Sequence, residues 1–174
     1  MNTEEIYQRL APKYPDEKME LTVGARLPVT STQTGDPCIV IPVNRLLDLM
    51  RSLKDEELFS FDCLSSLTAI DRLKEGRFEV VYHLFSYRHR HRVTLKLYLP
   101  RQDDAHLPTV EGLWPCANWL EREVFDLFGI RFDSHTDLRR IMLPDDWVGH
   151  PLRKDYKEQE DYHGISTTRP PLIL

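Results

Sequence analysis

Hydrophobic and polar residues alternate along the middle of the chain, a pattern typical of β-strands with one buried and one wet face. Residues 78–86 and 91–99 are predicted strands joined by a turn at 87–90, and a further strand is predicted over 63–70 with a turn at 72–76. The positions that share the inward face of the two central strands are Phe78, Val80, Tyr82, Leu84, His91, Val93, Leu95, Leu97 and Leu99. An antiparallel sheet with one buried face follows from this alternation.

A helix is predicted over residues 115–128, because apolar residues recur there at three- and four-residue spacing. Pro115 suits the first position of a helix, and Gly129 is placed to end it in the left-handed conformation. Its polar side is expected to face solvent, with Arg122 and Asp126 one turn apart in an exposed pair worth about 0.3–0.5 kcal/mol. The apolar stripe is Ala117, Leu120, Val124, Leu127 and Phe128, and the polar stripe is Trp119, Arg122, Glu123 and Asp126.

Shorter elements surround these. In the first half of the chain we expect a helix that is capped by Thr3 and ends near residues 12–15, followed by a strand over 18–23 and a polar loop over 30–37. A strand over 38–41 and a helix after Asn44 come next. Later in the chain we expect a loop over 103–108 and a strand over 130–132. The predicted fold class is α+β: a two-layer sandwich in which helices cover a mixed, largely antiparallel sheet. Residues 1–132 are expected to form this globular domain.

Residues 133–174, which we call the arm, lose this periodicity and contain several prolines. A solvated tail has no reason to carry aromatic residues such as Trp147 and Tyr156. We therefore expect an extended C-terminal arm that lies on another surface, because its own domain is too small to cover all of it.

Composition narrows the function. The chain has 174 residues and a formal net charge of −5, which argues against nucleic-acid binding. Its three cysteines contain no C-x-x-C pair and are too few for an iron–sulfur cluster. No apolar run approaches a membrane span, and the acidic N-terminus does not resemble a secretion signal.

Candidate metal chemistry has simpler explanations. His89 and His91 lie in a basic turn that is best interpreted as an exposed hairpin tip. Asp145 and Asp146 follow a proline, as in ordinary turns. Two alternatives stay open: a small metal-dependent hydrolase using His135, His150 and Asp145 or Asp146, and a self-contained homodimeric binding module.

A longer motif begins in the predicted helix. It runs E-R-E, a two-residue gap, an acid and two apolar residues, and then a histidine and an R-x-apolar ending. L-P-D-D-W and G-H-P-L-R-K-D-Y follow at residues 143–147 and 149–156. The motif residues that we take as candidate signature and interface positions are Trp119, Glu121, Arg122, Glu123, Asp126, His135, Arg139, Arg140, Trp147, Arg153, Asp155 and Tyr156.

From residue 78 to 156 this pattern resembles the C-subunit family of respiratory complex I, the proton-pumping NADH:quinone oxidoreductase. Thr136 and Lys157 stand where that family usually has proline, and both lie on the path of the arm. The same module also resembles part of membrane-bound hydrogenases and related dehydrogenase complexes.

The resemblance implies that this chain is a non-catalytic subunit in the part of complex I that projects from the membrane, which is called its peripheral arm. It implies no cofactor in this chain, with FMN and iron–sulfur clusters in partner subunits. The implied partners are the D, B and I types, on the cytoplasmic side of the bacterial inner membrane. With such partners, the C-terminal arm is expected to pack on a neighbouring subunit through Trp147, Arg153, Tyr156 and Tyr162. A charge-paired contact between helix and arm, or between helix and partner, is expected from Glu121, Arg122, Glu123, Asp126, Arg139 and Arg140.

Overall fold

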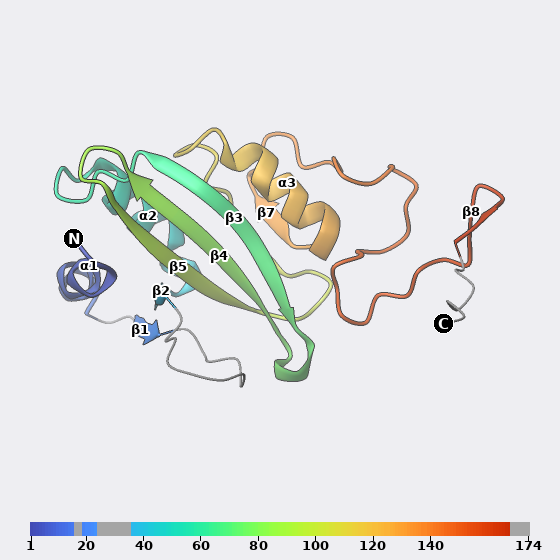
Figure 1. The fold of residues 1–174 in the computed structure, drawn as a ribbon, viewed down its shortest axis with the longest axis horizontal. Coiled ribbons are helices and arrows are strands. Elements are labelled where there is room, and N and C mark those ends of the chain that lie inside the picture. Colours follow the sequence, from blue (N-terminus) through green and yellow to red (C-terminus); the bar gives the residue numbers. More distant parts are fainter. Residues whose placement is uncertain (16–18, 24–35, 168–174) are drawn as a thin grey trace, which may run out of the picture.

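The computed structural model describes residues 1–15, 19–23 and 36–167, and these form an α+β fold (Figure 1). Five strands make one sheet in the order β1-β2-β5-β4-β3, with β2 parallel to β5 and the other neighbours antiparallel. The strands are β1 (Glu20–Val23), β2 (Pro37–Val40), β3 (Cys63–Arg72), β4 (Arg77–Ser86) and β5 (His91–Pro100). The predicted mixed, largely antiparallel sheet is confirmed. Residue 18 of the predicted first strand and residues 30–35 of the predicted loop lie outside the described residues.

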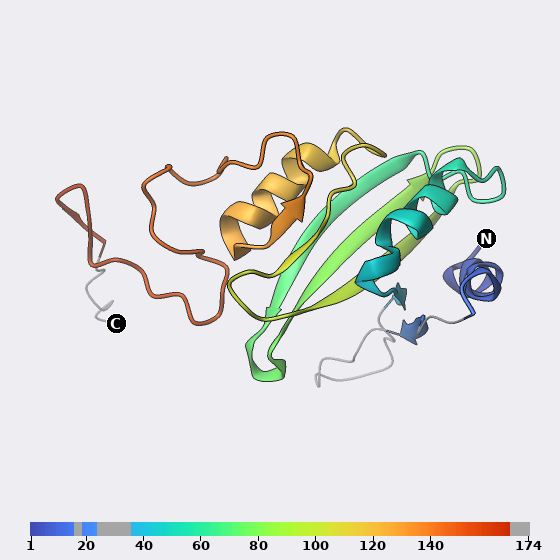
Figure 2. The same cartoon turned by 180° about the vertical axis from the view of Figure 1, so that it is seen from behind.

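Helices cover one face of the sheet. Figure 2 shows α2 in front of the strands, and Figure 1 shows the opposite face of β3, β4 and β5 with no helix over it. The nine predicted inward residues of the central strands are each at most 5% exposed, which confirms that they are buried. The other face of β4 is not wet throughout, since Glu79 and Val81 are 4% and 5% exposed. The helices are α1 (Thr3–Leu10), α2 (Leu46–Asp55) and α3 (Ala117–Phe128), with 3-10 turns η1 (Ala11–Lys13), η2 (Val43–Arg45) and η3 (Leu73–Glu75).

The start of the first helix differs from the prediction. Asn2, not Thr3, caps α1: its side chain accepts the Glu5 N–H at 2.8 Å, and the Glu5 carboxylate accepts the Asn2 N–H at 3.2 Å. This reciprocal capping box satisfies two backbone donors with one pair of side chains, so it outcompetes a cap one residue later.

The third helix and the loop before it also differ. Helix α3 begins at Ala117, two residues beyond Pro115. The predicted loop 103–108 contains β6 (His106–Pro108), which pairs in parallel with β7 (Arg131–Asp133). A three-residue strand is stabilised by hydrogen bonds to a partner strand that is distant in sequence. The hydrophobic periodicity of residues 103–108 therefore could not predict it.

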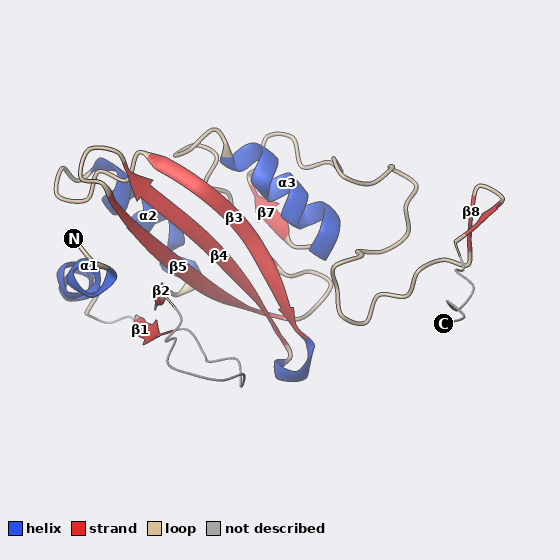
Figure 3. Ribbon diagram, viewed as in Figure 1, coloured by secondary structure: helices blue, strands red, loops and turns tan. Residues whose placement is uncertain are grey.

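Beyond β7 the arm is drawn almost wholly as loop in Figure 3. Its regular elements within the described residues are the two-residue strands β8 (Asp161–Tyr162) and β9 (Ile165–Ser166). No helix in the described parts of the chain is long and apolar enough to cross a membrane.

Candidate functional site at the junction of helix α3 and the arm

Arg122 and Asp126, on the polar side of α3, are buried, so the expectation that this whole stripe faces solvent was wrong. Glu121, Arg122 and Asp126 are 0%, 6% and 0% exposed, whereas Trp119 is 64% exposed. The segment 109–111 and the first part of the arm both bond to this side of the helix. Helical periodicity separates a polar side from an apolar one, but it cannot tell whether water or a polar backbone faces the polar side.

Asp126 binds the backbone of the arm. Its Oδ2 accepts the N–H groups of Ile141, Met142 and Leu143 at 3.1, 2.8 and 2.9 Å. Its Oδ1 accepts Arg140 Nη1 at 3.1 Å. Three successive amides and one guanidinium therefore compensate a fully buried carboxylate, which would otherwise be very costly.

Arg122 makes the complementary contact. Its Nε donates to the carbonyl of Arg139 at 3.1 Å, and its Nη2 donates to the carbonyl of Arg140 at 3.4 Å. Its Nη1 lies 3.7 Å from Asp137 Oδ2. The predicted pair with Asp126 does not form, because each of the two side chains is turned to the arm instead of to its helical neighbour.

Three of the predicted positions lie at the rim of this junction. The Arg139 side chain is 72% exposed and pairs with Asp137 at 3.0 Å, so Arg139 contributes its carbonyl rather than its charge. Glu123 is half-buried and makes no hydrogen bond or ion pair with any described residue. The guanidinium of Arg122 lies 5.1 Å from the centre of the Trp119 ring, which leaves most of the indole open to solvent.

Glu121 holds the segment that precedes α3. Its Oε1 accepts the Val110 N–H at 2.8 Å, and its Oε2 accepts the hydroxyl of Thr109. Burial raises the pKa of Glu121 to about 7, and the nearby charge of Glu111 adds to this rise.

His135, at the start of the arm, is completely buried beside these two carboxylates. Its Nδ1 accepts the Asp137 N–H at 3.0 Å, which puts the ring proton on Nε2, and Nε2 donates to the Asn118 carbonyl at 3.1 Å. Nε2 also lies 3.6 Å from Glu111 Oε2 and 3.9 Å from Glu121 Oε2. His135 therefore orders the entry of the arm.

The end of α3 is completed by the arm. Three groups of the arm donate hydrogen bonds to the last three carbonyls of the helix. His150 Nδ1 donates to Asp126 O at 2.8 Å, the Leu152 N–H donates to Leu127 O at 3.1 Å, and Arg153 Nε donates to Phe128 O at 2.6 Å. These are groups that a helix cannot satisfy internally. Gly129 ends the helix at φ 75°, as predicted, and a Cβ there would lie 2.5 Å from His150 Nε2 and 2.7 Å from Arg153 Nη2.

A second attachment joins the arm to the sheet. Asp71 is buried and accepts Arg101 Nε at 2.8 Å and the Lys154 N–H at 2.8 Å, and Arg101 also pairs with Asp155. Burial acts to raise the pKa of Asp71, but the bonds from Arg101 and Lys154 hold this pKa below its ordinary value. Asp71 and Arg101 were not among the predicted site residues. The available signal was an acid at a core-facing position, two residues after buried Ala69.

The outer part of the arm has its own cluster. Trp147 Nε1 donates to the Tyr156 hydroxyl at 3.1 Å, and the Trp147 and Tyr162 rings are 5.2 Å apart. Tyr162 and His163 both bond Asp146, at 3.0 and 2.7 Å. The four residues expected to bind a partner thus fall into two groups within this chain: Arg153 bonds the chain's own domain, whereas Trp147, Tyr156 and Tyr162 lie together in the outer arm.

The described residues do not assemble a metal centre. His135 and His150 each bond a backbone carbonyl, and Asp146 is engaged by aromatic neighbours. His89 and His91 likewise bond carbonyls, of Glu57 and Phe59. Among residues 1–15, 19–23 and 36–167, no group of three His, Cys, Asp or Glu side chains could hold a metal ion. The residues of the hydrolase alternative are thus not brought together.

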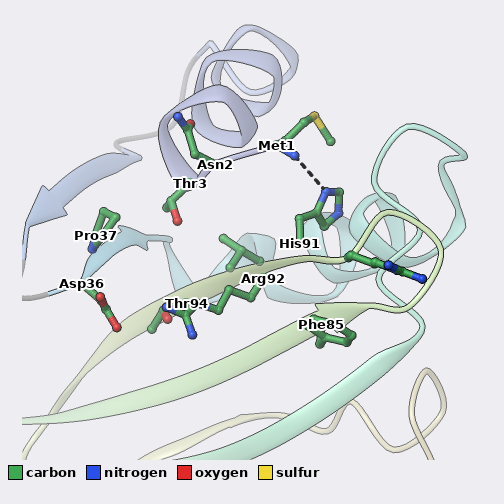
Figure 4. A pocket seen from close by; sticks show the side chains of 11 residues that line it. Met1, Asn2, Thr3, Asp36, Pro37, Phe85, His91, Arg92 and Thr94 are labelled. Atoms are coloured by element: carbon green, nitrogen blue, oxygen red, sulfur yellow. Dashed lines mark hydrogen bonds between the residues drawn. The ribbon is translucent and has the colours of Figure 1, made fainter.

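A cavity of about 540 Å³ lies elsewhere, between the start of α1 and β5 (Figure 4). Met1, Asp36 and Arg92 are among its lining residues, and the N-terminal amine is 3.4 Å from His91 Nδ1. None of the twelve motif residues lines it. The cavity is therefore separate from the junction of α3 and the arm.

Known proteins share the sequence pattern and the fold of this chain. A family model described as respiratory-chain NADH dehydrogenase, 30 Kd subunit, matches residues 39–162. The C subunit of the NADH-quinone oxidoreductase of Moorella thermoacetica is 46% identical over 125 residues, which cover 72% of this chain and 82% of that protein. The corresponding protein of Geobacter sulfurreducens is 43% identical over 136 residues, which cover 75% of this chain and 82% of that protein.

A solved structure agrees with these relatives. A chain of the membrane-bound sulfane sulfur reductase, an archaeal respiratory membrane complex, superposes with a TM-score of 0.69 at 29% identity, covering 88% of this chain and 85% of that one. The family match spans well over half of the chain and includes nearly the whole junction. The chain therefore belongs to the family of the 30 kDa subunit of the respiratory-chain NADH dehydrogenase.

Proposed function

We propose that the chain is a non-catalytic subunit of a proton-pumping NADH:quinone oxidoreductase, and that its arm binds neighbouring subunits of that complex. The observation that carries this proposal is the use of the motif. Its buried charged residues, Glu121, Arg122 and Asp126, bond the backbone of the chain itself. Groups engaged in this way position a segment and are not free to act on a substrate.

The arm offers a surface to another protein. Met142, Val148 and Ile165 are 60%, 66% and 71% exposed, while residues 150–155 are bonded back to the domain. Trp119, on α3, adds a fourth large apolar side chain to the exposed set. Aromatic and apolar side chains on a well-held backbone suit the centre of a protein interface.

The neighbours in this proposal are the D, B and I subunits, and the chain is peripheral on the cytoplasmic side of the bacterial inner membrane. FMN and iron–sulfur clusters belong to partner subunits. Cys38, Cys63 and Cys116 are free, and none of the three pairs with another. This supports an assembly role, because a four-thiolate cluster needs more ligands than this chain has.

Affinity purification from native membranes tests the proposal. A tagged full-length chain is expected to retain cofactor-bearing subunits with NADH:quinone reductase activity. Val148→Asp and Ile165→Asp put charges on the exposed arm, so each should lower subunit recovery several-fold. Leu73→Asp is the matched control, because Leu73 is 43% exposed on the turn between β3 and β4. Unchanged recovery with both arm variants, or recovery of the chain alone, would overturn the proposal.

A related membrane complex is the second candidate. The likeness to a chain of the archaeal sulfane sulfur reductase, at a TM-score of 0.69, favours it. The same purification separates the two candidates. NADH oxidation by the retained subunits supports the first, and hydrogenase or other dehydrogenase activity without NADH oxidation supports the second.

A further inference from the structure

We propose that Glu121 is a proton-binding site of the folded chain, and that its ionisation weakens the contact of residues 109–111 with α3. The site belongs to the chain itself and does not depend on the chain's place in a complex. The ligand is a single proton exchanged with water, so only the carboxyl O–H bond forms and breaks.

The surroundings of Glu121 favour its neutral form. The side chain is 0% exposed, and no lysine or arginine of the described residues pairs with it. Its two hydrogen bonds come from Val110 N–H and the hydroxyl of Thr109, both uncharged donors. This contrasts with Asp126, one turn further along α3, which has a guanidinium and three amides. Burial without a cation penalises the charged state of a carboxyl group.

Three titratable groups face Glu121 from the elements packed against it. Glu111, from the segment before α3, is held ionised by bonds from Asn118 and Thr136 and adds a negative charge. His135, from the arm, has its Nε2 3.9 Å from Glu121 Oε2, and its Nδ1 accepts the Asp137 N–H. Tyr82, from β4, completes the set.

Tyr82 faces Glu121 from the sheet. Its side chain is fully buried, and its hydroxyl has no hydrogen-bond partner among the described residues. Burial, and then the charge of Glu121, raise the pKa of Tyr82 well above its ordinary value. Tyr82 is therefore uncharged near neutral pH and supplies no charge that could compensate an ionised Glu121.

The hydroxyl oxygen of Thr109 can accept a hydrogen bond from a protonated Glu121. Thr109 Oγ1 contacts Glu121 Oε2 and also accepts the Glu111 N–H at 3.1 Å. When Glu121 is protonated, its Oε2–H donates to Thr109 Oγ1. When the proton leaves, the Thr109 hydroxyl donates instead, and the new charge lies near that of Glu111. Repulsion between the two carboxylates then loosens residues 109–111.

Carboxyl ¹³C NMR of the full chain, with residues assigned through the backbone, measures the site directly. The Glu121 carboxyl signal is expected to titrate with a midpoint near pH 7, the value to which its pKa is raised. Glu111→Gln removes the neighbouring charge and should move this midpoint to lower pH. A Glu121 midpoint near the ordinary value of 4.5 would overturn the proposal, as would no shift in the Glu111→Gln chain.

Unfolding provides the second readout. An acid whose pKa is raised on folding stabilises the folded state least at high pH, so thermal stability should fall as pH rises from about 5 to about 8. Glu121→Gln mimics the protonated side chain and should remove most of this slope. Glu123→Gln, two residues away and half-exposed, should retain it. Equal slopes in the wild-type and Glu121→Gln chains would contradict the proposal.

Discussion

The sheet core and the α3–arm junction are built by opposite physical means. Under the sheet, apolar side chains such as Val80 and Leu97 are 0% exposed and pack in one continuous cluster. At the junction, Arg122 and Asp126 are equally buried, but their partners are backbone amides and carbonyls of the arm. The core depends on volume and shape, whereas the junction depends on the position of individual hydrogen-bonding groups.

This difference bears on what each region can tolerate. A core position accepts another apolar residue of similar volume at modest cost. A buried carboxylate that serves three amides accepts no apolar substitute, because its partners would lose their bonds together. Hence the charged motif residues act as positioning residues for the arm, and the apolar residues determine the stability of the domain.

The largest expected effect comes from Asp126→Ala. It leaves the guanidinium of Arg140 and three backbone amides without the buried carboxylate that accepts from them, which should cost about 3–5 kcal/mol. The arm should detach while the sheet persists, so limited proteolysis should cut within residues 139–156 at denaturant concentrations where the domain is still folded. Mass spectrometry of the fragments locates the cuts.

Leu97→Ala provides the contrasting core variant. It should lower the free energy of unfolding by about 2–5 kcal/mol through a cavity, yet leave the arm protected until the whole domain unfolds. If both variants expose the arm and the domain together, the two regions form one cooperative unit, and the distinction between them is wrong.

Gly129→Ala tests the geometry of the junction rather than its charge. A left-handed residue with a Cβ costs about 1–2 kcal/mol, and here the Cβ would also collide with the His150 and Arg153 side chains. We expect the variant to lose the bonds of the arm to the end of α3 and to become protease-sensitive near residue 150. Tm by circular dichroism and the same proteolysis assay measure both effects.

Gly112→Ala is the control for that change, because a Cβ at Gly112 meets nothing within 4 Å. It should change stability by less than about 0.5 kcal/mol, as surface substitutions usually do. A Gly129→Ala chain as stable and as protease-resistant as the Gly112→Ala chain would show that the arm does not need this close approach.

The sequence predicted the sheet well and the junction only in part. The side chains of a strand point alternately to its two faces, so a shift by one residue would turn every apolar side chain of β4 or β5 from the core to the other face. The positions of the apolar residues therefore identify the inward face of both strands. The motif pointed to Glu121, Arg122, Asp126 and Arg140, but not to the backbone amides and carbonyls that the helix residues bond, since contacts between residue 126 and residues 141–143 depend on the path of a loop. Asp71 carried a local signal, an acid on an inward face, but its partners lie 30 and 83 residues away.

Arg139→Ala has the smallest expected effect, and it separates charge from position at the junction. Arg139 and Arg140 are adjacent and chemically identical, yet the Arg139 side chain is 72% exposed, whereas that of Arg140 is 17% exposed and bonds Asp126. Removing Arg139 takes away only an exposed pair with Asp137, so it should change the free energy of unfolding by less than about 0.5 kcal/mol.

Arg140→Ala removes a charged partner from a buried carboxylate and should cost about 1.5–3 kcal/mol. Urea titration of both chains measures the difference. Equal losses would mean that the motif acts through its total positive charge, and the bonds to the backbone of the arm would then not explain it.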